Sequence, residues 1–181
     1  MDTKHATTRR QAGLTLIELA IVVVVAAIVA AAAAPSLATF IEARRLEGAA
    51  TRLAADIHFV RSDALARNRP LRLSFQAHAG ATCWIAHTGA ATQCTCAAPG
   101  PAVCTGGAME IKTVRLAAAD GIALAANVAS IAFDPLHGTS TPTGTLRLVA
   151  PSGRAIHHVV NVMGRARSCS PAGRVAGYRP C

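Results

Sequence analysis

Apolar residues are spread unevenly along the chain, and their longest run lies close to the amino terminus. From Leu19 to Ala34 there is no polar side chain, and over residues 14–34 only Thr15 and Glu18 interrupt the run. At about 1.5 Å per residue, an α-helix over this stretch would be about 30 Å long. That length is enough to cross the hydrocarbon core of a bilayer, so the pattern predicts a transmembrane helix over residues 14–34.

Beyond Pro35 the apolar residues become periodic. They recur at alternating steps of four and three, which is typical of one buried face of an amphipathic helix: Leu46, Ala50, Leu53, Ile57, Val60 and Ala64. Charged residues are expected to cover much of the remaining surface: Arg44, Arg45, Glu47, Arg52, Asp56, Arg61, Asp63 and Arg67. Pro70 is expected to stop the helix, because the residue before a proline avoids helical geometry. We therefore expect one helix over about residues 14–68, with its amphipathic half within residues 35–69.

After Pro70 the period of the pattern falls to two. Leu71, Leu73, Phe75 and Ala77 alternate with three polar residues, Arg72, Ser74 and Gln76, as in a half-buried strand. Further strands are predicted at residues 83–87, 110–116, 122–127, 130–134, 145–149 and 155–163, separated by turns rich in Gly and Pro. One long helix followed by many short strands indicates an α+β fold, with the helix packed on an antiparallel sheet and a globular domain over residues 70–181.

Length limits how many domains the chain can form, and charge indicates on which side of a membrane each part lies. The 181 residues leave room for one membrane helix and one small domain, and the net charge is +9. Lys4, Arg9 and Arg10 precede the apolar run, and the positive-inside rule keeps such residues in the cytoplasm. The sequence therefore predicts a single-pass protein of the bacterial inner membrane with a periplasmic carboxyl-terminal domain.

All six cysteines follow the membrane segment, in a compartment where disulfides are the expected state of thiols. Cys169 and Cys181 are expected to pair and to close a loop at the carboxyl terminus. A bond between Cys94 and Cys96 would be strained, so these two residues are expected to pair with Cys83 and Cys104, in either of two ways. The C-x-C spacing fits a zinc site poorly, so no metal is predicted.

The sequence carries no sign of catalysis. His157 and His158 are neighbours on a predicted strand and would point to opposite faces, which excludes them as ligands of one ion. There is no nucleophile beside a base, no Gly-rich phosphate loop and no pair of carboxylates in the pattern. No cofactor and no enzymatic activity are predicted.

The segment Gly13-Leu14-Thr15-Leu16-Ile17-Glu18-Leu19 resembles the signature of type IV prepilins, in which a basic leader ends in Gly before a long apolar helix. The resemblance implies that a prepilin peptidase cuts after Gly13, which removes residues 1–13, and that Leu14 becomes the methylated amino terminus. It also implies that Glu18 pairs with the amino terminus of a neighbouring subunit in a filament, and that Pro35 is the helix proline common in pilins. Ordinary signal cleavage or an uncleaved anchor would leave a carboxylate inside the apolar run unexplained.

The whole pattern is similar to the FimT/FimU/GspH group of minor pilins and pseudopilins. The resemblance rests on the end of the helix near Pro70, the Trp84 strand before a Cys-rich loop, residues 133–138 and residues 160–167. It implies a type IV pilin-like fold and assembly with other pilins through the amino-terminal helix.

Residues 164–167, Gly-Arg-Ala-Arg, resemble the GRxR motif with which FimT-type minor pilins bind DNA. Residues two apart in an extended segment project to one side, so Arg165 and Arg167 would lie together. Arg174 and Arg179 sit in the expected Cys169–Cys181 loop, and no acidic residue follows Asp134. Guanidinium groups bind phosphates in pairs of hydrogen bonds, which favours duplex DNA of any sequence as a partner.

Three functions follow from these observations. The first is a DNA-capturing minor pilin, placed at the tip of a type IV pilus, that serves natural transformation. The second is a minor pilin that only primes assembly or caps the pilus. The third is a GspH-type pseudopilin of a type II secretion system.

Overall fold

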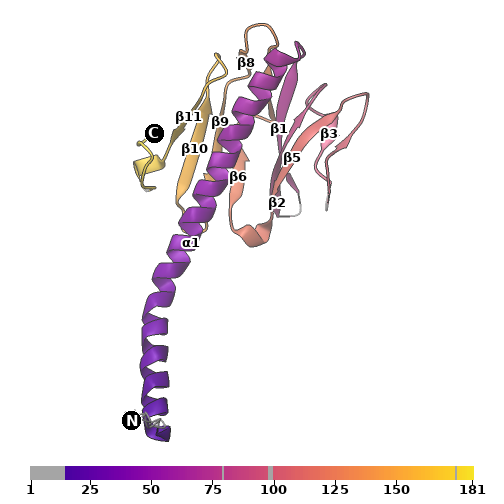
Figure 1. The fold of residues 1–181 in the computed structure, drawn as a ribbon. Coiled ribbons are helices and arrows are strands. Elements are labelled where there is room, and N and C mark those ends of the chain that lie inside the picture. The colour runs from indigo at the N-terminus through magenta and orange to yellow at the C-terminus, as the bar shows by residue number, and fades with distance from the viewer. Residues whose placement is uncertain (1–14, 79, 98–99, 174) are drawn as a thin grey trace, which may run out of the picture. The chain divides into compact units, whose positions relative to one another are not determined.

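A computed structural model describes residues 15–78, 80–97, 100–173 and 175–181. Within them, one long α-helix is followed by short strands that form two larger antiparallel sheets and one small sheet (Figure 1). The elements are α1 Leu16–Ala66, β1 Leu71–His78, β2 Ala81–His87, β3 Cys94–Thr95, β4 Val103–Cys104, β5 Glu110–Leu116, η1 Ala118–Asp120, β6 Ala123–Ala126, β7 Ser130–Phe133, β8 Ser140–Thr141, β9 Gly144–Val149, β10 Ala155–Val160, β11 Ala166–Cys169 and η2 Pro171–Gly173.

The first sheet has the strand order β5-β2-β1-β7-β8, and the second has the order β11-β10-β9-β6. β3 and β4 form the small third sheet. The predicted α+β class with antiparallel strands is confirmed. The strands β3, β4 and β8 were missed because two-residue strands carry too few alternations to read, and β11, Ala-Arg-Ser-Cys, was missed because it contains no large apolar residue. β10 ends at Val160 rather than near residue 163.

The chain divides into two compact units, residues 1–39 and 40–181. In the first unit, Thr15 caps the start of α1: the backbone N–H of Glu18 donates to Thr15 Oγ1 at 3.2 Å. Threonine followed three residues later by glutamate is the pattern of a capping box, and a carboxylate in the first turn suits the positive end of the helix dipole. In the described part of the chain, α1 is the helix that is long and apolar enough to cross a membrane.

The carboxyl-terminal end of α1 is set by Asn68 rather than by Pro70. Asn68 has a φ of 49°, in the left-handed region, and the N–H of Arg69 then donates to the carbonyl of Ala64 at 3.2 Å. Asparagine is one of the few residues that adopt this conformation readily at a helix terminus. The helix therefore ends at Ala66, two residues before the expected end.

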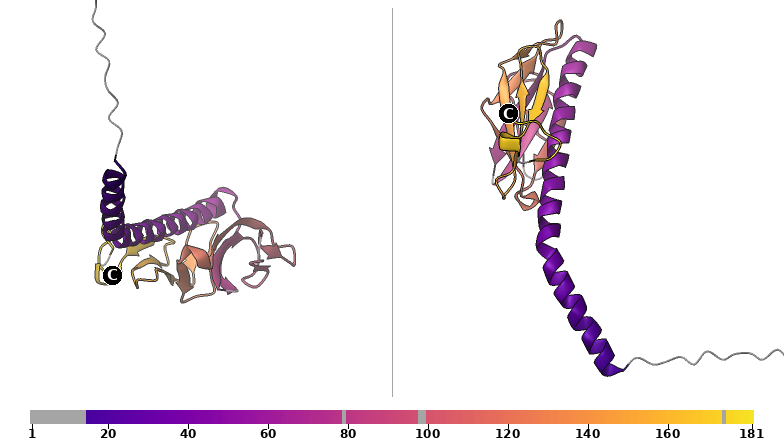
Figure 2. Two further views of the ribbon diagram at one scale, coloured as in Figure 1. Left: turned by 90° about the horizontal axis from the view of Figure 1, so that it is seen from below. Right: turned by 90° about the vertical axis from the view of Figure 1, so that its left-hand side faces the viewer.

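In the second unit, the end of α1 within residues 40–66 lies along one face of both large sheets (Figures 1 and 2). The six periodic apolar residues predicted for the buried face all have 0% exposure: Leu46, Ala50, Leu53, Ile57, Val60 and Ala64. They join one core with apolar residues of both sheets, including Leu73, Trp84 and Leu148. This core and the three disulfides lie wholly within residues 40–181, so this unit has what it needs to fold by itself.

Asp56 was expected on the surface of the helix, and that prediction is wrong. The residue is 2% exposed, and its carboxylate accepts a hydrogen bond of 2.8 Å from Trp84 Nε1 on β2. Its other oxygen lies 2.5 Å from Lys112 Nζ on β5. A buried charge is tolerable when a cation and further hydrogen bonds compensate it, and here both partners come from the first sheet.

The alternation in β1 is also only partly as predicted. Leu71, Leu73 and Phe75 face the core, but Ala77 is exposed and Ser74 is buried. Ser74 Oγ lies 2.8 Å from Nε2 of the buried His87, so the polar face of the strand is covered at this point.

The three disulfides are Cys83–Cys96, Cys94–Cys104 and Cys169–Cys181. The pairing at the carboxyl terminus agrees with the expectation, and of the two arrangements left open for the other four cysteines the structure has this one. Cys94–Cys104 joins β3 to β4, and Cys83–Cys96 attaches that small sheet to β2.

Candidate nucleic-acid interface

The arginine motif lies on the hairpin formed by β10 and β11. The strands pair antiparallel, with Val159 opposite Arg167, and the turn closes with a hydrogen bond of 2.8 Å from the N–H of Gly164 to the carbonyl of Asn161. Asn161 and Arg165 exchange two further bonds, one of them through the Asn161 side chain. Arg165 and Arg167 are both exposed and, being two residues apart in paired extended chain, they project to the same side.

Gly164 has a structural role within the motif. Its φ is +69°, and a Cβ at this position would lie 2.3 Å from the carbonyl oxygen of Gly138. That carbonyl also accepts a hydrogen bond of 2.8 Å from Arg61 Nε on α1. Only glycine allows the hairpin turn to pack so closely on the neighbouring loop. The glycine of the motif therefore shapes the turn, and the two arginines are free to face solvent.

The carboxyl-terminal tail is held beside the hairpin. Cys169 on β11 is bonded to Cys181, and the N–H of Ser170 donates to the carbonyl of Arg179 at 2.9 Å. Buried Val175 packs into the core and anchors the middle of the loop. A depression of about 170 Å³ is lined jointly by Arg167 and the last residues of the tail. The exposed Arg179 is thus attached through its backbone to Ser170, at the end of β11.

The other predicted site residues fall into two groups. Arg174 lies outside the described residues, as do Gly13 and Leu14 at the expected cleavage point. Glu18 and Pro35 are both within α1, Glu18 in its first turn and exposed. Cleavage, methylation and subunit pairing at these positions remain predictions.

The two adjacent histidines point to opposite faces of β10, as predicted. His158 is 1% exposed on the inner face, where its Nδ1 lies 2.8 Å from Ser168 Oγ. Burial lowers its pKa to about 4, although the Ala50 carbonyl opposes part of that shift. His157 lies on the outer face, where partial burial and then the positive charge of Arg147 lower its pKa.

One serine–histidine pair was not foreseen from the sequence. Ser74 donates to His87 Nε2, and His87 Nδ1 in turn lies 2.8 Å from the carbonyl of Thr88. Burial lowers the pKa of His87, which favours the neutral ring. Ser74 and His87 are 1% and 0% exposed, so no substrate can reach the hydroxyl, and the pair serves to satisfy buried polar atoms.

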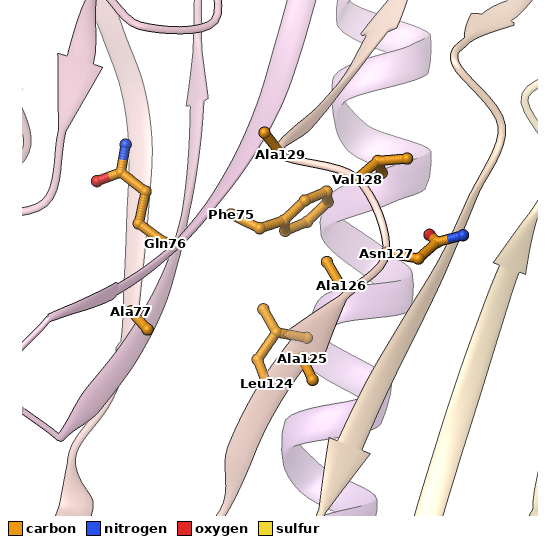
Figure 3. Close-up of a pocket in the computed structure, with 9 residues that line it drawn as sticks. All are labelled: Phe75, Gln76, Ala77, Leu124, Ala125, Ala126, Asn127, Val128 and Ala129. Atoms are coloured by element: carbon orange, nitrogen blue, oxygen red, sulfur yellow. The ribbon is translucent and has the colours of Figure 1, made fainter.

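A groove of about 350 Å³ separates β1 from the end of β6 and the loop after it (Figure 3). Its lining is neutral: Phe75, Gln76, Ala77, Leu124, Ala125, Ala126, Asn127, Val128 and Ala129. With no titratable side chain in its lining, the groove offers no group for acid–base chemistry. Among the described residues there is also no cluster of three or more His, Cys, Asp or Glu that could hold a metal ion.

Comparison with known families agrees with this architecture. A model described as type II transport protein GspH matches residues 49–164, which is more than half of the chain. The chain belongs to the GspH family. A second model, the prokaryotic N-terminal methylation motif, matches residues 8–34. No curated protein and no solved structure matches the chain.

Membership of the GspH family makes this protein a type IV pilin-like pseudopilin. The methylation motif and the apolar helix together indicate anchoring to a membrane, association with other pilins and processing by a prepilin peptidase. Proteins of these families are structural rather than enzymatic. The GspH match ends at Gly164, so Arg165, Arg167 and Arg179 lie beyond it.

Proposed function

We propose that this protein is a FimT-like minor pilin that captures duplex DNA at the tip of a type IV pilus. The observation that carries the proposal is the pair of exposed arginines on the β10–β11 hairpin, Arg165 and Arg167, with the exposed Arg179 in the tail that the Cys169–Cys181 disulfide ties to β11. The fold fixes the backbone positions of these arginines before DNA binds, and guanidinium groups suit phosphate oxygens.

The amino-terminal helix supplies the assembly part of this function. In the proposal, a prepilin peptidase cuts between Gly13 and Leu14, and the new amino group at Leu14 is methylated. The subunit, anchored in the inner membrane with its domain in the periplasm, then enters the filament through α1. There the carboxylate of Glu18 pairs with the amino terminus of a neighbour, and Pro35 lies within the assembled helix.

Binding of a fluorescent duplex by residues 40–181 tests the DNA role. Fluorescence anisotropy is measured at several NaCl concentrations for the native unit and for Arg165→Gln with Arg167→Gln. Each lost phosphate contact makes the negative slope of log K against log salt less steep by about 0.9. The slope of the double variant should therefore be less steep by about 1.8. The matched control, Arg165→Lys with Arg167→Lys, keeps the charge and should retain most of the slope. Absence of binding by the native unit at low salt, or unchanged binding by the double Gln variant, would refute the proposal.

A second function is favoured by the description of the matched family, a type II transport protein. In that case the subunit belongs to a secretion pseudopilus that moves folded protein cargo. Deletion of the gene separates the two functions. Loss of DNA uptake with normal secretion supports the first, and loss of secretion with normal uptake supports the second. Loss of uptake together with loss of the filaments indicates a subunit that only primes assembly, whereas the first function requires loss of uptake with filaments still present.

A further inference from the structure

The outer face of the second sheet continues the charge of the hairpin beyond the motif. On β9, Arg147 is exposed and lies opposite His157 of β10, which in turn lies opposite Cys169 of β11. The next row along the strands is Thr145, Val159 and Arg167, in the same register. The sheet therefore carries arginines at both sides of β10 on a single face.

The strands that form this face carry no acidic side chain. None of the four strands β6, β9, β10 and β11 contains Asp or Glu, and no acidic residue follows Asp134. α1 packs on the opposite face of the sheet, and its Glu42 accepts a hydrogen bond from Ser152 in the turn between β9 and β10. His157 lies between Arg147 and the terminal disulfide, 3.8 Å from Cys181 Sγ, and adds a hydrogen-bond donor to the same row.

We propose that the DNA-binding face extends from the hairpin across β10 to Arg147, so that one duplex is contacted at both sides of this strand. The inference rests on the proposed function and assigns a further binding residue to it. Strands lie about 4.8 Å apart and residues rise about 3.3 Å, so two strands and two residues place the Cα atoms of Arg147 and Arg167 about 12 Å apart. Long, flexible arginine side chains at this spacing reach separate phosphates of one duplex.

The composition of the face defines how the duplex is recognised. The outer rows hold arginine, histidine, threonine, valine, alanine and the disulfide-bonded Cys169, and Tyr178 of the tail is half-buried against the core. Without an exposed aromatic ring on the face, bases have no stacking surface there. Binding through phosphates alone predicts affinity that depends on salt and is independent of base sequence.

The test compares Arg147→Gln with Arg52→Gln in the anisotropy assay on residues 40–181. Arg52 is an exposed arginine of α1, on the opposite side of the sheets, and its loss changes the net charge equally. Arg147→Gln should lower the salt slope by about 0.9 and weaken binding at low salt several-fold, for duplexes of two unrelated sequences alike. Arg52→Gln should leave the slope unchanged.

Each outcome separates the two proposals. If Arg165→Gln with Arg167→Gln weakens DNA binding, while the Arg147→Gln variant has the same affinity and salt slope as the native unit, the extended face is refuted and the proposed function stands. If Arg52→Gln weakens binding as much as Arg147→Gln, the effect is one of net charge and the extended face is again refuted. If the native unit binds no duplex at low salt, both proposals fall.

Discussion

The buried carboxylate of Asp56 leads to a prediction about its ion pair with Lys112. Replacing Lys112, the more exposed partner, should destabilise the domain more than replacing Asp56. The Asp56 side chain is 3% exposed, whereas that of Lys112 is 41% exposed. Replacing Lys112 by Met leaves an ionised carboxylate in the core with Trp84 as its remaining partner. Removing one member of a buried pair in this way costs about 3–5 kcal/mol of unfolding free energy.

Replacing Asp56 by Asn should cost less. The amide oxygen can still accept the hydrogen bond from Trp84 Nε1, and the released Lys112 ammonium can turn toward water because its side chain is already partly exposed. What is lost is one charge-assisted interaction, worth about 1.5–3 kcal/mol at most. We therefore expect Asp56→Asn to destabilise the domain by about 1–2 kcal/mol, clearly less than Lys112→Met.

Urea unfolding of residues 40–181, followed by tryptophan fluorescence, measures both changes. Trp84 is the single tryptophan of the chain and contacts Asp56 directly, so its emission reports on this part of the core. Arg52→Met is the control for exchanging an exposed cation for a methionine and should change stability by less than about 0.5 kcal/mol. If Asp56→Asn costs as much unfolding free energy as Lys112→Met, or if neither exceeds the control, Asp56 and Lys112 do not form the buried pair described above.

Two further predictions concern the hairpin. The pKa of His158, about 4 against a usual 6.5, means that the folded state resists protonation, so stability present above pH 6.5 should fall by about 3 kcal/mol by pH 4. Urea titrations over this range should show a correspondingly flatter pH profile for His158→Gln, and an unchanged profile would contradict the assignment. Gly164→Ala should cost about 2–4 kcal/mol in thermal unfolding, because the new methyl meets the Gly138 carbonyl. Gly153→Ala, with a φ of +78° and open space, should cost only about 1 kcal/mol, and equal losses would show that backbone strain alone decides.

The helix and its buried face could be predicted because their signal is local. The steps of four and three from Leu46 to Ala64 require one packing partner along the whole length, and any sheet can supply it. The same holds for most of the longer strands, whose alternation needs no knowledge of their neighbours. The end of the helix was harder to predict, because Asn68 adopts the left-handed conformation and ends the helix before Pro70.

Asp56 could not be placed from the sequence because its burial depends on residues far along the chain. Charged residues on a helix usually face water, and nothing near Asp56 distinguishes it from Asp63. Its partners, Trp84 and Lys112, lie on two strands that come together only when the first sheet forms. The burial of Ser74 could not be predicted for the same reason, since its partner His87 is thirteen residues away on the adjacent strand.

The candidate interface also has a part that could be predicted from the sequence and a part that could not. Arg165 and Arg167 could be grouped from their spacing alone, because two residues along an extended chain share a side. Arg147 could be grouped with them only once the register of β9, β10 and β11 was known, since a shift of one residue would have turned it to the core face. A sequence motif identifies the arginines that share a side of one strand. The pairing of strands determines which residues of the neighbouring strands lie on the same surface.

The position of Gly164 at the end of the family match bears on what family membership can predict. The matched residues, 49–164, contain the buried face of the helix from Ala50 onward, both large sheets except β11, and the glycine on which the hairpin turn depends. Many features in that range are explained by packing, including the close approach of Gly164 to Gly138. The exposed arginines after it make no such contribution. A relative with the same turn but neutral residues at the positions of Arg165 and Arg167 would keep the fold and lose the charged surface. Binding of DNA must therefore be tested on these side chains, because membership of the GspH family would be the same with or without them.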